Sequence, residues 1–326
     1  MGTPVVAEYT LSSSEAERIQ SLARSLDGES VEDRRFLARA AVWANELPRN
    51  LRAFLEDFRV TESFPACRIG GLPVDSKHIG PTPTVSSRWR AKAASETRAE
   101  LVAVLLSSCL GDVFGWRLQH DGFLIHDLAP RPEHEDTGLG TGSRQHINWH
   151  TEDSFHPCRA DYVGLLCVRN PAEVPTTIGF LDSSLLSDAD RQILAQPVFT
   201  FRPDPSYFVS DAEPVPGPDK GSILYGDSAD PYLRFDQDYI DLPDGIEGIE
   251  EAIESLRRAI EVNLIDLSLH SGDLLFLDNR RAVHGRASFQ ATYIETERWL
   301  KRVNITLDLK RSRHLRDSAI DRVIRV

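Results

Sequence analysis

Cysteine is scarce in this sequence, and the few cysteines do not form a recognisable metal-binding or redox pair. The 326 residues contain only Cys67, Cys109, Cys158 and Cys167, and no two of them have CxxC spacing. The chain is also too long to depend on a disulfide framework, and a bond between Cys158 and Cys167 is the less favoured alternative. We therefore expect reduced, mostly buried thiols in a cytoplasmic protein.

Long apolar stretches and basic clusters are also lacking. No segment approaches about 18 consecutive apolar residues, so we expect no membrane span. The N-terminus does not combine a basic region with an apolar core, as a secretory signal would. The net charge of −13 repels nucleic acids and anionic membranes, so neither is expected as a partner. This charge could help to attract a cationic small molecule, although most acidic side chains are expected to be solvated surface.

The order of apolar patterns along the chain predicts the fold class. Residues 1–65 show helical spacing, which predicts a helical N-terminal layer. Residues 101–110 predict a buried helix with Gly111 as its C-cap. Beyond Phe123, short strand-like segments alternate with Gly, Pro and Asp, interrupted by one helix over residues 247–262. We predict a single domain over residues 1–326, of α+β class with a mainly β core: a jelly roll (double-stranded β-helix) with outer helices.

One proline-rich segment interrupts the strands. Residues 203–221 contain five prolines and several acidic side chains. A loop of this length within a compact domain is typical of a disordered segment or of an active-site lid. We favour the lid because a segment with candidate site residues follows it.

The central chemical motif is the segment WHTED. His150 and Glu152 are two residues apart, so in a strand they point to the same face and could occupy adjacent positions on a metal. His284 follows a buried strand and a turn, and its ring could supply a third ligand. Two histidines and one carboxylate leave metal positions open, which suits iron(II) oxygenase chemistry. The alternative is that an isolated HxE pair and a distant histidine are structural.

Two arginines strengthen the metal-site interpretation. Arg298 and Arg302 lie fourteen and eighteen residues after His284. Their spacing allows them to share a face of a helix or of a strand. Each guanidinium can bind a carboxylate through two hydrogen bonds. A pair of surface arginines in ion pairs is the alternative, which the nearby histidine makes less favourable.

Several segments together resemble the clavaminate synthase-like branch of the iron(II)/2-oxoglutarate dioxygenases. Within that branch the sequence is most similar to the viomycin-pathway L-arginine hydroxylase and to related free-arginine hydroxylases and desaturases. The matching segments span most of the chain after residue 100: residues 111–116, 149–153, 159–166, 278–286 and 298–302. The resemblance implies an oxidoreductase with iron(II) as cofactor and with 2-oxoglutarate and dioxygen as cosubstrates.

The resemblance also implies a role for each candidate residue. The metal ligands would be His150, Glu152 and His284. Arg298 would hold the distal carboxylate of 2-oxoglutarate with help from Thr176, and Arg302 would hold the substrate carboxylate. Glu152 could in addition accept a hydrogen bond from the substrate amine.

The segment PYLRFDQD indicates a cationic substrate side chain. Asp236 and Asp238 could both face a pocket and would suit a guanidinium or ammonium group, and an exposed acidic turn is the alternative. The resemblance favours the pocket, because the related arginine hydroxylase grips a guanidinium with a similar Asp-x-Asp. That enzyme has two consecutive glutamines where this chain has Gln119 and His120, which we expect in the substrate site. The glycine-rich stretch around Gly140 is more similar to the streptothricin-pathway relative, and we expect it there too.

Together these features predict hydroxylation of free L-arginine at C3 or C4, in the biosynthesis of a specialised metabolite such as an antibiotic. The differences from the related enzyme at His120 and around Gly140 leave 4,5-desaturation of arginine open, as well as hydroxylation of lysine or citrulline. The aspartate pair argues mildly against citrulline, whose ureido group is neutral. A jelly-roll protein that binds a cationic amino acid without catalysis is the alternative from another class, and the intact triad with both arginines argues against it.

Overall fold

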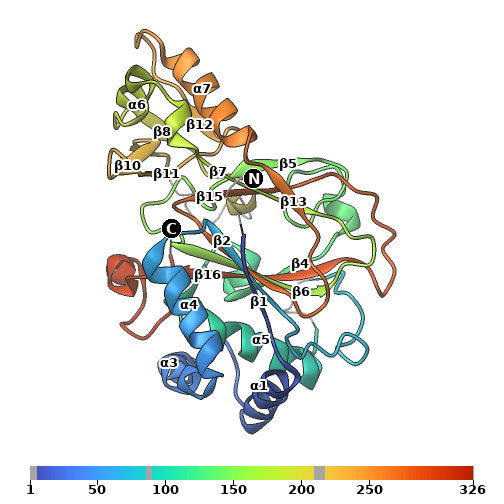
Figure 1. Ribbon diagram of the computed structural model, residues 1–326. Helices are drawn as coiled ribbons and strands as arrows, with labels where there is room; N and C mark the ends of the chain where they lie inside the picture. The colour runs from blue at the N-terminus through green and yellow to red at the C-terminus, as the bar shows by residue number, and fades with distance from the viewer. Residues whose placement is uncertain (1–5, 86–89, 209–216, 326) are drawn as a thin grey trace.

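Two β-sheets form the core of the protein (Figure 1). The computed structural model describes residues 6–85, 90–208 and 217–325. Within these residues the larger sheet has the order β1 (Val6–Thr10), β2 (Ala66–Gly70), β14 (Leu274–Asp278), β6 (Tyr162–Arg169), β16 (Trp299–Thr306), β3 (Asp112–Trp116) and β17 (Val323–Ile324), and β4 (Ile125–Leu128) also pairs with β16. The smaller sheet has the order β13 (Ile265–Leu267), β7 (Thr176–Phe180), β15 (Ala282–Arg286) and β5 (Ile147–His150). The predicted α+β fold with a jelly-roll core is confirmed.

The larger sheet separates two apolar clusters, because successive side chains of a strand point to opposite faces. In β14, Leu274 and Phe276 belong to the cluster beneath the N-terminal helices. Leu275 and Leu277 belong to the other cluster, which fills the interior of the jelly roll. A strand buried on both faces is apolar at every position, which explains the uninterrupted LLFL run.

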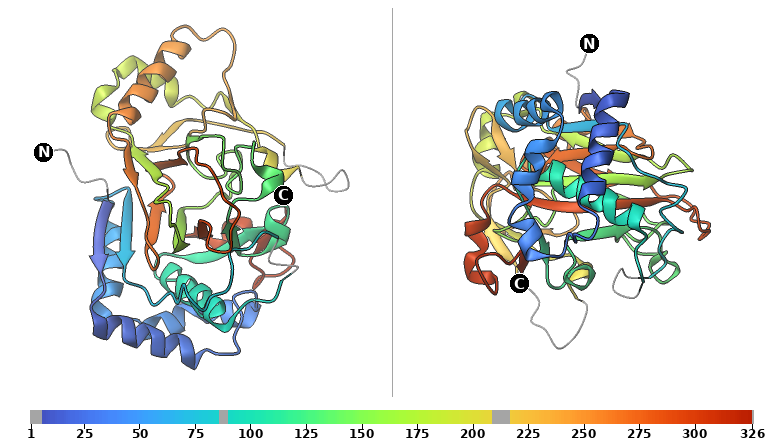
Figure 2. Two further views of the ribbon diagram at one scale, coloured as in Figure 1. Left: turned by 90° about the vertical axis from the view of Figure 1, so that its right-hand side faces the viewer. Right: turned by 90° about the horizontal axis from the view of Figure 1, so that it is seen from below.

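The N-terminal helices cover the outer face of the larger sheet (Figures 1 and 2). They are α1 (Ser13–Ser25), α2 (Arg34–Leu37), α3 (Ala40–Trp43), α4 (Arg49–Thr61) and α5 (Ala94–Ser107). A capping box between Ser12 and Glu15 begins α1 and satisfies its first amide groups. Helix α5 contacts β3, β6 and β16 directly. Every residue in its second half, 99–107, is buried, which explains the apolar run at residues 101–106.

Three details differ from the sequence-based expectation. The helical layer is preceded by a strand, because Val6–Thr10 pairs in parallel with β2 at the sheet edge. The helical spacing of residues 1–65 does not give continuous helices throughout: residues 34–43 contain the short helices α2 and α3, and Val42 in α3 is 67% exposed. Gly111 is not the C-cap of α5, which ends at Ser107. It is instead required by packing, since a Cβ there would lie 2.4 Å from the carbonyl oxygen of Thr306.

The described residues between β7 and β13, 181–208 and 217–264, form one insertion, whose helices α6 and α7 lie at the top of Figure 1. It contains α6 (Asp188–Leu194), β8 (Phe199–Phe201), β9 (Asp219–Gly221), β10 (Leu224–Gly226), β11 (Pro231–Leu233), β12 (Ile240–Asp241) and α7 (Ile249–Glu261). The helix expected over residues 247–262 is therefore present as α7. Of the expected lid, residues 209–216 lie outside the described residues; the two flanking parts are a 3-10 turn, Pro205–Tyr207, and β9, which pairs with β8.

The described helices are either too short or too polar to cross a bilayer.

Candidate active site

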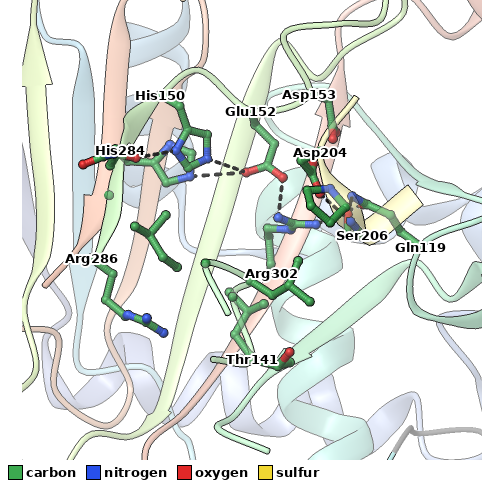
Figure 3. A pocket seen from close by; sticks show the side chains of 18 of the residues that line it. Gln119, Thr141, His150, Glu152, Asp153, Asp204, Ser206, His284, Arg286 and Arg302 are labelled. Carbon is green, nitrogen blue, oxygen red and sulfur yellow. Dashed lines mark hydrogen bonds and ion pairs between the residues drawn. The ribbon is translucent and has the colours of Figure 1, made fainter. Parts of the chain in front are cut away.

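The two candidate histidines face each other across neighbouring strands of the smaller sheet. His150 ends β5, His284 is the central residue of β15, and the two are register partners in this antiparallel pair. Their ring centroids lie 4.7 Å apart. Gly285 permits the close approach of the strands, because a Cβ there would lie 2.5 Å from the carbonyl oxygen of Ile147. Sheet pairing thus brings together two imidazoles that are far apart in the sequence (Figure 3).

Both imidazoles direct Nε2 towards the carboxylate of Glu152. Nε2 of His284 lies 3.3 Å from Oε2 of Glu152, and Nε2 of His150 lies 3.9 Å from the same oxygen. Nδ1 of His150 lies 2.8 Å from the carbonyl oxygen of Asn148. A carbonyl only accepts, so Nδ1 carries the proton and Nε2 keeps its lone pair for a metal. The three candidate ligand atoms lie within 4.8 Å of one another, and this donor set fits an iron(II) ion.

Glu152 is buried, yet its surroundings favour the ionised form. Burial alone would raise its pKa, but the Arg302 guanidinium and the two histidines hold the pKa below its ordinary value. Nη1 of Arg302 donates to Oε1 of Glu152, which leaves Oε2 facing the imidazoles. Nη2 of Arg302 also donates to Oε1 of Gln119 at 3.1 Å and to Nδ1 of His126 at 3.0 Å. Arg302 is therefore held in place by three partners, Glu152, Gln119 and His126.

A second guanidinium, that of Arg298, is buried beside a further arginine. Arg298 is 4% exposed, and its Nε atom has no hydrogen-bond partner among the described residues. Burial lowers its pKa to about 10. Burial and the charge of Arg298 lower the pKa of Arg286 to about 9, and Arg286 donates to the carbonyl oxygens of Gly142 and Gln145. A buried positive region of this kind can hold a carboxylate.

One cavity of about 790 Å³ connects these groups. This volume is typical of a small-molecule site, for which about 300–1,000 Å³ is usual. The residues predicted from the sequence all line it: Gln119, His120, Gly140, His150, Glu152, Thr176, Asp236, Asp238, His284, Arg298 and Arg302. The fold therefore gathers every candidate residue around a single space.

The two aspartates of the Asp-x-Asp pair differ in their environments. Asp236 forms a β-bridge with His150, and burial raises its pKa to about 6. Asp238 is exposed, and both of its carboxylate oxygens lie 3.0 Å from the side-chain nitrogen of Asn148. Asp236 thus lies against a candidate metal ligand, whereas Asp238 lies nearer to solvent.

His120 and Gly140 lie on further walls of the cavity. The ring of His120 stacks on that of His126, with centroids 4.1 Å apart and an interplanar angle of 20°. Burial, followed by the charge of Arg302, lowers the pKa of His120 to about 3, so the imidazole is neutral. A Cβ at Gly140 would lie 3.0 Å from a methyl carbon of Leu128, so the absence of a side chain keeps this wall open.

The sequence did not reveal a set of contacts between Asp153 and the insertion. Asp153 accepts hydrogen bonds from the Tyr207 hydroxyl at 2.5 Å and from Nε1 of Trp116 at 2.6 Å. Ser206, beside Tyr207, accepts from Nε2 of Gln119 at 2.8 Å. The turn Pro205–Tyr207 is therefore hydrogen-bonded to Asp153, which follows Glu152, and to Gln119, which is a partner of Arg302. In the sequence, the prolines of residues 203–221 suggested a lid, but no local pattern singled out Tyr207.

Comparison with known proteins finds relatives along most of the chain. Residues 185–304 match the family described as "Taurine catabolism dioxygenase TauD, TfdA family". The L-ornithine/L-arginine 3-hydroxylase of Catenulispora acidiphila is 40% identical over 318 residues, which cover 90% of this chain and 92% of the relative. The enduracididine beta-hydroxylase of Streptomyces hygroscopicus is 37% identical over 319 residues, which cover 91% of this chain and 92% of the relative.

Solved structures of the non-haem iron oxygenase OrfP are similar over the whole fold. The complex with iron and alpha-ketoglutaric acid has a TM-score of 0.90 and 39% sequence identity, and covers 97% of this chain and 99% of that chain. The complex with iron, succinate and (3S)-hydroxy-L-Arg has a TM-score of 0.91 and 37% identity, with the same coverage. The likeness therefore includes both sheets, the helical layer and the insertion.

Proposed function

Since this chain belongs to the TauD/TfdA family as a clavaminate synthase-like iron(II)/2-oxoglutarate dioxygenase, we propose that it hydroxylates free L-arginine at C3. The charge pattern of the cavity is the observation that supports a basic amino acid as the substrate. Arg302 lies beside the candidate metal ligands, and the carboxylates of Asp236 and Asp238 line the same space. A basic amino acid presents the complementary charges: a carboxylate at one end and a cation at the other.

Iron(II) would be held by Nε2 of His150, Nε2 of His284 and Oε2 of Glu152. When bound, iron(II) activates dioxygen with the electrons of 2-oxoglutarate, so that a C–H bond can be oxidised. Arg298 would hold the distal carboxylate of 2-oxoglutarate, with Thr176 as a neighbour on the cavity wall. The buried Nε atom of Arg298, which lacks a partner among the described residues, supports this assignment.

The substrate would be oriented from both ends. Arg302 would bind its carboxylate, and Glu152 would accept a hydrogen bond from its amine. Asp236 and Asp238 would bind the guanidinium, and the walls formed by Gln119, His120 and Gly140 would border the carbon chain. Holding the substrate in one orientation decides which C–H bond is presented for oxidation. The names of the two relatives, a 3-hydroxylase and a beta-hydroxylase, both refer to the C3 position and support C3 over C4.

We also propose that residues 203–221 act as a lid within a single domain. The fastening of the Pro205–Tyr207 turn to Asp153 and Gln119 supports this role, because a cover over the cavity excludes water from the reaction. The four cysteines are free thiols, in keeping with a cytoplasmic location. We place the product in the biosynthesis of a specialised metabolite such as an antibiotic.

The deciding experiment reconstitutes the protein anaerobically with iron(II) and 2-oxoglutarate, and then adds air and one amino acid from a panel. The panel contains arginine, ornithine, lysine and citrulline, because ornithine and lysine appear in the names of relatives. Mass spectrometry distinguishes hydroxylation, a gain of one oxygen, from desaturation, a loss of two hydrogens. Proton NMR then locates the hydroxyl group on C3 or C4. Arginine left unchanged while another amino acid is oxidised would contradict the substrate assignment.

The aspartates provide a second test of the substrate. Asp236→Asn and Asp238→Asn should each raise KM for arginine by about tenfold or more, because each removes a charge-assisted hydrogen bond. Asp244→Asn is the matched control, since Asp244 is exposed in the same insertion and does not line the cavity. Equal effects of all three substitutions would show that the pair does not bind the guanidinium.

A further inference from the structure

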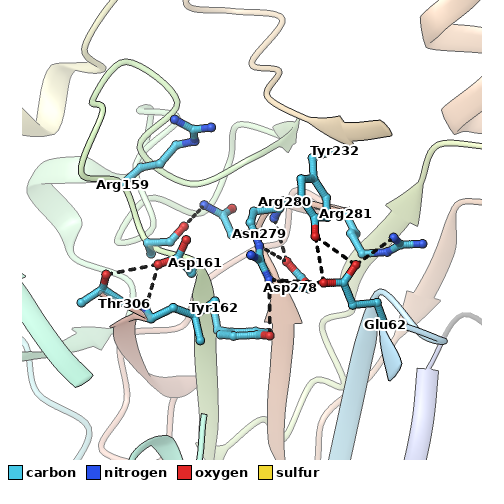
Figure 4. Close-up of polar contacts among 12 residues, drawn as sticks. Glu62, Arg159, Asp161, Tyr162, Tyr232, Asp278, Asn279, Arg280, Arg281 and Thr306 are labelled. Carbon is cyan, nitrogen blue, oxygen red and sulfur yellow. Dashed lines mark hydrogen bonds and ion pairs between the residues drawn. The ribbon is translucent and has the colours of Figure 1, made fainter. Parts of the chain in front are cut away.

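A single side chain, that of Asn279, holds both backbone polar groups of Glu152 (Figure 4 shows Asn279 among its neighbours). The backbone amide of Glu152 donates to Oδ1 of Asn279 at 2.6 Å, and Nδ2 of Asn279 donates to the carbonyl oxygen of Glu152 at 3.0 Å. Asn279 is 1% exposed. A primary amide matches a peptide group in this way because it offers one acceptor and two donors.

Glu152 needs such support because it lies beyond the end of a strand. Strand β5 ends at His150, and the residues that follow form a looped segment. Asp153 has a φ of +51°, in the left-handed region, so the backbone turns sharply directly after Glu152. Sheet hydrogen bonds therefore do not fix the direction of this carboxylate, in contrast to the histidines, which lie within paired strands.

Asn279 also closes the base of this loop. Its second Nδ2 hydrogen is donated to the carbonyl oxygen of Ala160 at 2.8 Å, and its own backbone amide donates to the carbonyl oxygen of Asp161 at 2.9 Å. The two ends of the loop, Glu152 and Ala160, are thus joined through one amide group. Asn279 itself directly follows β14 of the larger sheet and precedes β15, which carries His284.

We propose that Asn279 is a positioning residue for the iron site: its amide fixes the backbone of Glu152 so that Oε2 faces the two imidazoles. The inference rests on the proposed role of Glu152 as a metal ligand. Residues that orient metal ligands without touching the metal commonly change metal affinity by about 10- to 100-fold.

Asn279→Asp tests the proposal with little change in shape. An aspartate keeps an oxygen for the Glu152 amide but cannot donate to the carbonyl oxygens of Glu152 and Ala160. We expect iron(II) affinity to fall about 10- to 100-fold in anaerobic titrations of the apoprotein. The visible charge-transfer absorbance of the iron(II)–2-oxoglutarate complex should also weaken or shift. Asn279→Ser, which is neutral and smaller, is measured in parallel in case the buried carboxylate prevents folding.

Asn170 provides a matched control elsewhere in the fold. Its Oδ1 accepts from the backbone amide of Val174 at 3.0 Å, and its Nδ2 donates to the carbonyl oxygens of Val174 at 3.0 Å and Leu269 at 3.2 Å. The hydrogen-bond pattern is the same as that of Asn279, but Asn170 does not line the cavity. Asn170→Asp should therefore leave iron affinity and the visible spectrum unchanged within about twofold, whatever it does to thermal stability.

Three results would overturn the proposal. Wild-type affinity and spectrum in a folded Asn279→Asp protein would do so, as would an equal loss of affinity in Asn170→Asp. Failure of both Asn279 variants to fold would show a general folding role instead. Absence of iron binding by the wild-type protein would also remove the proposed function, whereas the first two results leave that function intact.

Discussion

His150 and His284 are directly opposed residues of an antiparallel strand pair, and their rings lie 4.7 Å apart. The geometry of the smaller sheet, rather than a flexible loop, therefore sets the separation of the two imidazoles. Because sheet hydrogen bonds hold both residues, the pairing of β5 and β15 places the two imidazoles side by side. The arrangement leads to a first prediction about metal binding.

His284→Ala should abolish the iron(II)-dependent visible absorbance seen with 2-oxoglutarate and reduce arginine oxidation to background, because two donors cannot replace the three-donor set. Anaerobic difference spectra measure the first effect, and product analysis the second. His146 also lines the cavity but is exposed and lies away from the ligand set. His146→Ala should therefore retain the absorbance, and its loss there would contradict the ligand assignment.

Arg298→Lys should raise KM for 2-oxoglutarate by about 10- to 100-fold, because an ammonium group cannot make the paired hydrogen bonds of a guanidinium. KM for arginine, measured at saturating 2-oxoglutarate, should change much less. Steady-state kinetics with each substrate varied in turn separate the two effects. A larger change in KM for arginine would assign Arg298 to the amino acid rather than to the cosubstrate.

Tyr207→Phe removes the hydroxyl that donates to Asp153 at 2.5 Å and so loosens the Pro205–Tyr207 turn. If this turn belongs to a lid, water should enter the cavity more readily, and more 2-oxoglutarate should be consumed per hydroxylated arginine. The ratio of succinate to hydroxyarginine, measured by mass spectrometry, should rise by about two- to tenfold. Tyr225→Phe, outside the cavity, is the control, and an unchanged ratio in Tyr207→Phe would argue against the lid.

Lys301→Met should destabilise the protein by about 3–5 kcal/mol, because it removes the fully buried cation from among three buried carboxylates and leaves them to Arg90 and Lys92. Nζ of Lys301 lies 2.7–2.8 Å from oxygens of Glu96, Glu100 and Asp127, and the side chain is fully buried. Urea unfolding measures the change. The exposed residue Lys310 provides the control, since Lys310→Met should alter stability by less than about 0.5 kcal/mol.

Glu32 predicts a dependence of stability on pH. Burial raises its pKa from 4.5 to about 7, despite a hydrogen bond from the backbone amide of Leu124. The folded state therefore binds a proton more tightly than the unfolded state does, so this group lowers stability as pH rises from about 4.5 to about 7. Glu32→Gln should reduce this decline and stabilise the protein at pH 8, as measured by urea unfolding across that range. Glu29→Gln, at an exposed position, should leave the decline unchanged; equal slopes for wild type and Glu32→Gln would contradict the prediction.

Much of the fold and of the candidate site could be predicted from local patterns. Strand β14 and the second half of helix α5, residues 101–106, are recognisable because their burial makes nearly every residue apolar. His150 and Glu152 are recognisable because two residues of separation in extended chain place them on one face. Arg298 directly precedes β16 and Arg302 lies within it, and both line the cavity, as their even spacing in the sequence predicts.

Other features depend on contacts that no local pattern records. Asn279 is hydrogen-bonded to Glu152 although they are 127 residues apart in the sequence, and Tyr207 is hydrogen-bonded to Asp153 across 54 residues. Lys301 lies between Leu300 and Arg302 on β16, and the alternation of the strand turns it away from the cavity towards α5. Its partners Glu96 and Glu100 come from α5, and Asp127 comes from the paired strand β4, so only the packed structure shows the three carboxylates together. The contacts of Asn279, Tyr207 and Lys301 can therefore be recognised only once the fold is known.

The insertion between β7 and β13 separates, along the sequence, candidate substrate-binding residues from the strands that carry the two histidines. The strands of the jelly roll carry His150 and His284, whereas the contiguous stretch of residues 181–264 carries Asp236, Asp238 and the Pro205–Tyr207 turn. Recombination within that stretch could replace Asp236 and Asp238, which would bind the guanidinium, and leave the strands that carry the two histidines intact. Exchange of this one contiguous segment could then change the substrate preference while the candidate metal ligands stay the same.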